Sequence, residues 1–458
     1  MGRGFFNLKV IALFSTALVF GVSGCAQHRT DSVRMKPRPL GSEIPTFRPS
    51  AKPDDIPKEP RGHITVQDAL TLALMKSPDL AVTAWEIRAR EGAILQASLF
   101  PNPEISTEIE DLGGSAFSGT DQAEATISLG QFIELGGKRL KRKKLASLAF
   151  DLAGWDYEAK RIDLFAKVTQ AFVDVLGAQE NLALSEERVR LAQQVADTVS
   201  GRVQAGKVSP VEEIKAKVAL ASARIDVSRA KKGLEALRKQ LAATWGGTTP
   251  TFTLAKGNLR SIFPIPSFDQ LANHLSQNPE IARWATEISQ RESVIDLERA
   301  RVIPDITLSG GVRRFNETDT TGFVAGFSIP LPILNQNQGA IQEASAQLSK
   351  AKEERRATEV HLTAELTEAY RALSTSHSEV LGLQNNVLPG AEQAFNSVNE
   401  GYRLGKFGLL DVLDAQRTLF GARAQHLEAL IGYHQAVAGV ERLIGARLND
   451  VKNTKRKD

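Results

Sequence analysis

The sequence predicts a mainly α-helical protein with a smaller β-sheet part, in which one structural unit occurs twice. Aromatic residues make up only 6% of the chain whereas alanine and leucine abound, and this composition favours long helices over a β-rich globule. Apolar residues recur every three or four positions over very long stretches, as in a coiled coil. Landmark residues recur in the same order about 200 positions apart, which indicates an internal duplication.

The composition excludes several classes of function. The 458 residues carry a net charge of only +4, too small an excess for a nucleic-acid-binding protein. The single cysteine excludes an intramolecular disulfide and a thiolate zinc cluster. The chain has no HExxH motif, no nucleophile elbow and no closely spaced pair of histidines on a helix. We therefore expect neither an enzyme nor a cofactor, no metal site, and no nucleic-acid partner.

The beginning of the sequence is typical of an exported lipoprotein. Two basic residues and the apolar run Val10–Phe20 indicate a signal peptide at residues 1–24. Small residues precede Cys25 in the pattern of a bacterial lipobox, so we expect cleavage before Cys25 and its modification by lipid. The alternative is a stray or buried cysteine.

A proline-rich segment follows the lipobox. Residues 26–62 hold seven of the 19 prolines, which exclude a helix and favour an extended chain. We expect residues 25–63 to tether the lipid anchor to the fold, although plain disorder fits the composition equally well.

Two repeats account for most of the remaining chain. The sequence around Pro78 recurs around Pro279, 201 positions later, and the sequence around Gly206 recurs around Gly405, 199 positions later. The predicted parts are a first repeat at 64–246, a linker at 247–267, a second repeat at 268–446 and a basic tail at 447–458.

Each repeat has the same order of elements: a helix, two strands, a very long helix, a tight turn and a return helix. The first helices are expected at 66–99 and 268–301, the strands at about 103–111, 122–132, 305–315 and 321–331, and the long helical hairpins at about 138–245 and 338–445. The strands alternate apolar and polar residues over about ten positions, enough to span a bilayer when tilted. A small soluble sheet is the alternative. A helix of about 67 residues reaches ~100 Å, much more than the thickness of a bilayer.

Glycines and a proline mark the expected changes of direction. Gly206 and Gly405 lie where the long helices reverse, and glycine adopts the left-handed conformation needed there without a Cβ clash. Gly136 and Gly137 indicate a sharp strand-to-helix bend. Pro389 is expected to kink the second hairpin.

These dimensions favour a conduit. Four strands are too few to close a membrane barrel, since the smallest have eight, so the chain must form oligomers. Two copies would supply eight strands and three copies twelve. The long helices must then project from the membrane into the periplasm.

The duplication, the lipobox, the strand-to-helix junction Leu135–Arg139 and the tip motif Tyr402–Gln416 resemble the TolC-like outer membrane efflux proteins over residues 64–446. The resemblance implies a homotrimer in the outer membrane of a Gram-negative cell, with a 12-stranded barrel (four strands per chain) continuous with an α-helical coiled-coil periplasmic tunnel. It also implies a periplasmic adaptor (membrane fusion) protein and an inner-membrane pump, proton-driven in our interpretation, as partners. The junction Phe132–Arg139 is most similar to the CzcC-like heavy-metal branch, which favours divalent heavy-metal cations as substrate.

The resemblance also suggests functional residues at the tips. Asp411 and Asp414, three positions apart on one helix face, match entrance carboxylates that a trimer would gather into a ring of six, which favours cations. The alternative is that acids in a first helical turn complement the helix dipole.

Closed-state and docking contacts are implied as well. Glu212 and Tyr402 match positions that lock the closed state, whereas Phe407 replaces the basic partner and leaves Lys406 as the adjacent candidate. The tip residues expected in turns and adaptor docking are Gly206, Lys207, Gly405 and Gly408.

Two other functions remain open from the sequence. The same channel could serve drug efflux or type I protein secretion. A protein of another class, a lipid-anchored coiled-coil scaffold without a channel, would have no strands embedded in a membrane.

Overall fold

The computed structural model describes residues 38–47, 49, 57–112 and 122–451, all of which belong to one structural unit. The expected signal peptide, the lipobox Cys25, the loop at 113–120 and residues 452–458 of the expected tail lie outside the described residues. Within the described ranges, no helix combines the length and the apolar character that crossing a membrane requires.

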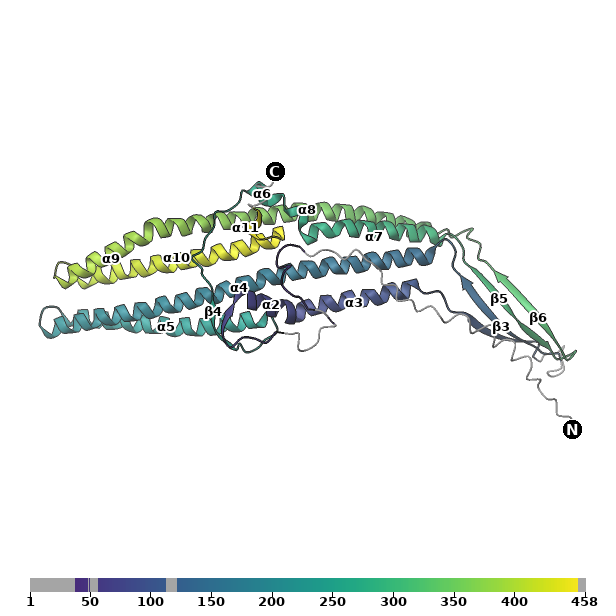
Figure 1. The fold of residues 1–458 in the computed structure, drawn as a ribbon, viewed down its shortest axis with the longest axis horizontal. Helices are drawn as coiled ribbons and strands as arrows, with labels where there is room; N and C mark the ends of the chain where they lie inside the picture. Colours follow the sequence, from purple (N-terminus) through teal and green to yellow (C-terminus); the bar gives the residue numbers. More distant parts are fainter. Residues whose placement is uncertain (1–37, 48, 50–56, 113–121, 452–458) are drawn as a thin grey trace, which may run out of the picture. The chain divides into compact units, whose positions relative to one another are not determined.

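The duplicated order of elements is visible in the fold (Figure 1). The first repeat contains α2 (Val66–Lys76), α3 (Pro78–Ser98), β2 (Glu104–Glu110), β3 (Glu124–Ile133), α4 (Lys138–Gln204) and α5 (Pro210–Ala243). The second contains α6 (Phe268–Ala272), the short 3₁₀ helix η3 (Leu275–Gln277), α7 (Pro279–Arg301), β5 (Ile306–Phe315), β6 (Thr320–Ser328), α8 (Gln338–Gly382), the π-helical turn η4 (Leu383–Val387), α9 (Leu388–Arg403) and α10 (Leu409–Ile444).

Prolines divide the first helix of each repeat, which the sequence analysis treated as continuous. Ser77 precedes Pro78 and has φ −58° and ψ 124°, and Asn278 precedes Pro279 with φ −57° and ψ 132°. Steric contact with the proline ring excludes the helical conformation from the preceding residue. Each proline then starts a new helix, where its missing N–H is not needed.

The four strands of the two repeats form one antiparallel sheet in the order β2-β3-β5-β6. Its register places Ile105 opposite Leu129 and Val312 opposite Phe323, so apolar side chains share one face. The opposite face is polar, and there Arg313 forms ion pairs with Glu110 (2.9 Å) and Glu124 (2.8 Å). Strand β6 ends at Ser328, before the predicted limit of 331, because Pro330 has no N–H for a ladder bond.

A second, two-stranded parallel sheet lies outside the duplicated pattern. Strand β1 (Gly62–Thr65) pairs with β4 (Phe252–Lys256), which occupies the segment expected to be a plain linker. Phe252 and Ala255 are buried in the main core. The linker is therefore a structural element that joins the beginning of the first repeat to its end.

The described part of the expected tether also packs on the helices. Leu40 and Ile44 are buried, and the fully buried guanidinium of Arg161 donates to the carbonyl oxygens of Leu40 (2.7 Å) and Arg38 (3.2 Å). Glu158 forms the ion pair with Arg161 at 2.8 Å. Residues 38–47 are thus held by the buried pair and are not a free tether.

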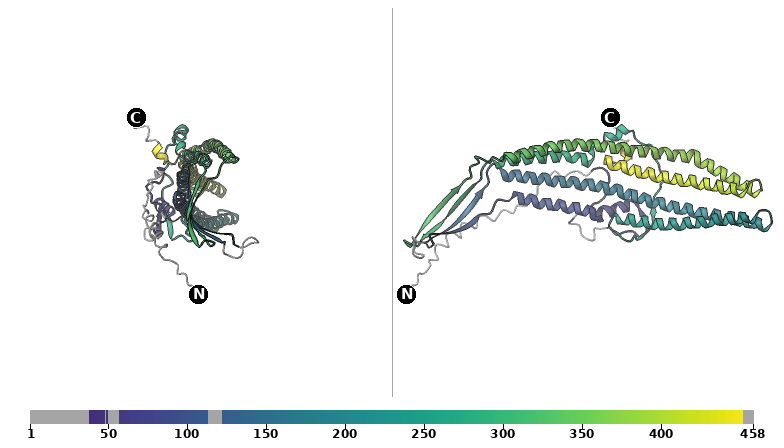
Figure 2. Two further views of the ribbon diagram at one scale, coloured as in Figure 1. Left: turned by 90° about the vertical axis from the view of Figure 1, so that its right-hand side faces the viewer. Right: turned by 180° about the vertical axis from the view of Figure 1, so that it is seen from behind.

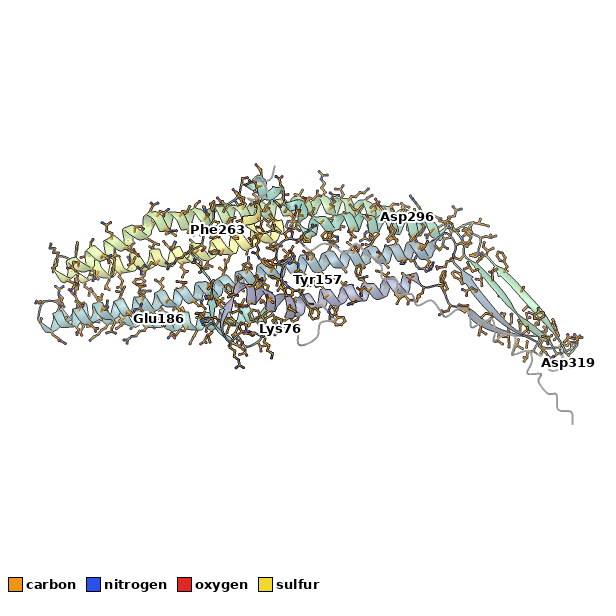
Figure 3. The ribbon with its side chains drawn as sticks, in the orientation of Figure 1. Lys76, Tyr157, Glu186, Phe263, Asp296 and Asp319 are labelled. Carbon is orange, nitrogen blue, oxygen red and sulfur yellow. The ribbon has the colours of Figure 1, made fainter. Side chains whose placement is uncertain are left out.

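The helices of the two repeats pack side by side (Figures 1 and 2). Helix α4 contacts α5 of its own repeat and α7 and α10 of the other, and α8 contacts α7 and α10. The largest apolar cluster lies where the repeats meet and includes Val168, Leu366 and Tyr433. The four-stranded sheet and the turns of the long hairpins lie at opposite ends of this bundle. Asp319 marks the turn between β5 and β6 at the sheet end (Figure 3).

Two local features differ from the expectations. The interruption of the second hairpin is the π-helical turn η4, which ends before Pro389 in the first turn of α9. Because Pro389 cannot donate to the preceding turn, the helix widens there. The expected basic tail begins with a short helix, α11 (Leu448–Val451), whose terminal residues Leu448 and Val451 are buried.

Candidate functional site

The long hairpins end in two turns of the same construction, called here the tips (residues 205–208 and 404–408). Gly206 has φ +69° and Gly405 has φ +78°, the left-handed conformation expected from the sequence. In the first tip the N–H of Lys207 donates to the Arg202 carbonyl (2.9 Å), and in the second that of Lys406 donates to the Gly401 carbonyl (2.7 Å). Both tips are therefore Schellman motifs, which satisfy the last carbonyls of the helix. They lie at the same end of the bundle (Figures 1 and 2).

The helix ends that precede the two tips contact each other through Arg202 and Tyr402. The Arg202 guanidinium donates to the Tyr402 carbonyl (2.9 Å) and lies over its ring, 4.5 Å from the centroid. Tyr402 is only 3% exposed and belongs to an apolar cluster with Val199 of the first hairpin and Val412 of the second. The contact thus links the ends of the two long hairpins within one chain.

Glu212 lies in the same environment. The Tyr402 hydroxyl and one carboxylate oxygen of Glu212 are buried without a hydrogen bond of normal geometry in the described part of the chain. Burial raises the pKa of the Tyr402 hydroxyl above its usual value, while the nearby Arg202 opposes this shift and Glu212 adds to it. The structure therefore brings together Tyr402, Glu212 and Arg202.

The basic member of this group is a residue that the sequence analysis missed. Lys406 is exposed, and no ion pair of its side chain is found among the described residues. Phe407 packs so tightly over Gly401 that a Cβ there would lie 2.3 Å from its ring. Arg202 comes from the first repeat, four residues before Gly206, so the motif of the second repeat gave no sign of it.

The two carboxylates that the sequence analysis expects at the entrance, Asp411 and Asp414, have local partners in the single chain. Asp411 accepts the N–H of Gly408 (2.8 Å), which caps the first turn of α10. Asp414 is exposed and forms an ion pair with Arg417 at 2.6 Å. No cluster of three or more potential metal ligands is found within the described ranges.

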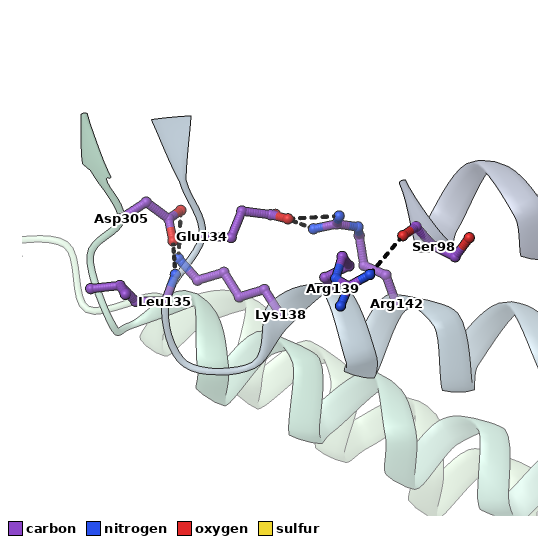
Figure 4. Close-up of polar contacts among 7 residues, drawn as sticks. All are labelled: Ser98, Glu134, Leu135, Lys138, Arg139, Arg142 and Asp305. Atoms are coloured by element: carbon purple, nitrogen blue, oxygen red, sulfur yellow. Dashed lines mark hydrogen bonds and ion pairs between the residues drawn. The ribbon is translucent and has the colours of Figure 1, made fainter. Parts of the chain in front are cut away.

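At the other end of the bundle, Asp305 holds the strand-to-helix junction (Figure 4). Its carboxylate accepts the N–H of Leu135 (2.8 Å) and the Lys138 ammonium (2.7 Å). Gly136 has φ +68°, and a Cβ there would lie 3.0 Å from the Ile303 side chain; Gly137 has φ +69° with open space around it. The first repeat is thereby fastened to the start of β5 in the second.

The corresponding bend in the second repeat uses asparagine. Asn337 has φ +58° before α8, and its amide donates to the carbonyl oxygen (2.9 Å) and carboxylate (2.8 Å) of Glu298. Asparagine tolerates the left-handed conformation better than most side chains, so it substitutes for glycine.

Duplicated hairpins, with a four-stranded sheet at one end and helix ends in contact at the other, define a channel subunit of the outer-membrane efflux class. The family model "Outer membrane efflux protein" matches residues 69–247 and 271–446, and the chain belongs to this family. It is an outer-membrane channel protein with a periplasmic tunnel, and it is not an enzyme.

Two relatives and one solved structure illustrate the similarity. The chain is 39% identical to the cobalt-zinc-cadmium resistance protein CzcC of Cupriavidus metallidurans, over 85% of this chain and 92% of that protein. It is 26% identical to the nickel and cobalt resistance protein CnrC of the same organism, over 62% of this chain and 67% of that protein. A membrane protein from Pseudomonas aeruginosa shares the fold at 18% identity, with a TM-score of 0.72 over 89% of this chain and 98% of that one.

Proposed function

We propose that this chain is the outer-membrane subunit of a tripartite system that exports divalent heavy-metal cations. Its 39% identity to a cobalt-zinc-cadmium resistance protein over 92% of that protein's length carries the proposal. The chain conducts substrate passively, and a periplasmic adaptor and a proton-driven inner-membrane pump supply selection and energy. Cys25, as the lipobox indicates, anchors the mature protein to the outer-membrane lipid.

The sheet supports assembly into a trimeric barrel. Its apolar face is uncovered within the described chain: Ile105 is 77% exposed, Phe323 91% and Phe327 64%. Strands β2 and β6 are the edges of the sheet, and their unpaired backbone N–H and C=O groups can form hydrogen bonds with a strand of another subunit. In a homotrimer, β2 of each subunit pairs with β6 of the next, which closes twelve strands with the apolar face toward lipid.

The tips support a gate at the periplasmic entrance. Tyr402, Glu212 and Arg202 hold the two hairpin ends together in the closed state, and Asp411 and Asp414 of three subunits surround the opening. A ring of carboxylates raises the local concentration of cations at a narrow pore. Gly206, Lys207, Gly405 and Gly408 form the turns on which the adaptor docks.

Metal and drug sensitivity of a deletion strain tests the proposal. We expect hypersensitivity to zinc, cobalt, cadmium or nickel, restored by the wild-type gene. The variant Asp411→Ala/Asp414→Ala is expected to restore resistance incompletely at normal trimer levels. Its matched control, Glu353→Ala/Glu354→Ala, removes two exposed acids from α8 and should restore resistance fully.

Three outcomes would contradict parts of the proposal. Hypersensitivity to lipophilic drugs alone would show that the substrate is a drug and not a metal cation, and it would still agree with an efflux channel. Loss of a secreted protein without any sensitivity would assign the channel to secretion. Full resistance with the double variant would remove the carboxylate ring from the mechanism.

A further inference from the structure

The beginning of α4 carries an unusual density of positive charge. Six of its first seven residues are basic: Lys138, Arg139, Lys141, Arg142, Lys143 and Lys144. The equivalent stretch of α8, residues 338–344, has no basic residue. The duplicated fold therefore does not require this charge. Positive charge at a helix N-terminus also opposes the helix dipole, so the cluster costs stability.

Only part of the charge is neutralised within the chain. Lys138 pairs with Asp305, Arg142 pairs with Glu134, and Arg139 donates to the Ser98 carbonyl at 3.0 Å (Figure 4). Among the described residues, no ion pair is found for the three remaining lysines, Lys141, Lys143 and Lys144. These three, called here the lysine triad, carry charge that no described side chain neutralises, and all three are at least partly exposed.

Exposed apolar side chains lie beside this charge. Phe100 is 70% exposed, Leu140 64% and Phe132 40%, and the Arg139 guanidinium lies 3.9 Å from the centroid of the Phe100 ring. Together with Lys138 and Arg139 they line a cavity of about 450 Å³ between the sheet and α4. The lining also includes Glu134, whose carboxylate is already paired with Arg142. Apolar walls next to a surplus of cations fit an amphiphile with an anionic head.

We propose that the lysine triad and this cavity form a binding surface for anionic phospholipid in the periplasmic leaflet of the outer membrane. The inference rests on the proposed insertion of the sheet in the membrane. The junction then lies at the lipid–water interface, where lysine side chains reach phosphate groups. An anionic headgroup fits better than a zwitterionic one, because the latter carries a cation that the triad repels.

Native mass spectrometry of the purified full-length trimer tests the proposal. The trimer is equilibrated with equal amounts of phosphatidylglycerol and phosphatidylethanolamine. We expect the wild type to retain phosphatidylglycerol preferentially, and Lys141→Gln/Lys143→Gln/Lys144→Gln to lose roughly ten-fold or more of that preference. The control Lys215→Gln/Lys232→Gln/Lys239→Gln removes equal charge from exposed positions on α5 and should behave like the wild type.

Other outcomes would overturn the inference. Equal retention of the two lipids by the wild type, or an unchanged preference in the triad variant, contradicts it. Displacement of the lipid by an equal concentration of inorganic phosphate would indicate a site for free phosphate. Dissociation of the triad variant into monomers would show that the lysines join subunits. Insertion into vesicles that contain both lipids is measured separately, and its failure in the wild type would instead refute the membrane-inserted sheet.

Discussion

Arg202 supplies the basic group that the motif of the second tip lacks. Its contacts with the ring and the carbonyl of Tyr402 join the ends of the two hairpins, although the two residues are 200 positions apart in sequence. A cation–π contact and a hydrogen bond of this kind each contribute on the order of 1 kcal/mol. In the proposed gate, a single side chain can therefore help to hold the two hairpin ends together.

We predict that Arg202→Gln weakens the contact between the tips and raises the conductance of the channel in planar lipid bilayers. The control is Arg224→Gln, which removes a 3.0 Å bond to Gln193 between α5 and α4 of the first hairpin, away from the tip. The control should conduct like the wild type. Identical conductance of Arg202→Gln and wild type would exclude Arg202 from the gate.

Glu441 near the end of α10 makes stability depend on pH. Burial raises its pKa to about 7, although the N–H of Leu448 (2.8 Å) and the charge of Arg447 oppose the shift. Between about pH 4.5 and 7 the unfolded chain loses this proton while the folded chain keeps it. The free energy of unfolding therefore falls as the pH rises through this range.

We predict that Glu441→Gln removes most of this pH dependence, because the amide stays neutral and its oxygen can still accept the Leu448 N–H. Thermal unfolding of the trimer at about pH 5 and pH 8 measures the effect. The exposed Glu428→Gln on the same helix is the control and should keep the wild-type dependence. An equal slope in Glu441→Gln would rule out this carboxyl as the source.

At the scale of elements, the two strand-to-helix bends offer a comparison within one molecule. Gly136 needs both a left-handed backbone and the absence of a Cβ, since a Cβ there would lie 3.0 Å from the Ile303 side chain, whereas Gly137 needs only the backbone conformation. We predict that Gly136→Ala costs about 1–3 kcal/mol, more than Gly137→Ala. Gly137→Asn should be nearly neutral, because Asn337 adopts the same conformation in the second repeat. Equal melting temperatures for all three variants would contradict this account.

The sequence predicted those elements whose signal is periodic or duplicated. Apolar residues recur at regular intervals along the long helices and along the four strands of the large sheet, and the glycines at the tips occur in both repeats. The positions of these elements therefore followed from local sequence pattern. Strands β1 and β4 could not be found in this way. They are four and five residues long and pair across about 190 positions, so no period reveals them.

Long-range polar contacts were equally hidden. Glu158 and Arg161 are three residues apart on a helix, a spacing that normally indicates a solvated surface pair. Only the fold shows that they are buried and hold the segment that contains Leu40. Similarly, the sequence pattern predicted Asp305 only as the first residue of a strand. Its bonds to Leu135 and Lys138 depend on how the two repeats pack against each other, which the local pattern does not show.

For the whole molecule, the two faces of the large sheet decide where it resides. Phe323 lies on the apolar face opposite Val312, and its neighbour Val324 lies on the polar face opposite Gly311. If the apolar face meets lipid, a charge on it must enter the hydrocarbon, whereas a charge on the polar face stays in water. A lysine at the bilayer midplane costs about 2–4 kcal/mol, and less near the interface.

We therefore predict that Phe323→Lys reduces the amount of trimer assembled in the outer membrane, and that Val324→Lys leaves it unchanged. Heat-modifiable trimer in membrane fractions measures both variants, and total expression corrects for degradation. The two substitutions introduce the same charge at adjacent positions of β6. A difference in assembly between the two variants therefore arises from the face on which the lysine lies and not from its position along the strand. If both variants assembled equally well, the apolar face would not be in lipid. Loss of assembly in Val324→Lys alone would place the polar face there and reverse the orientation of the sheet.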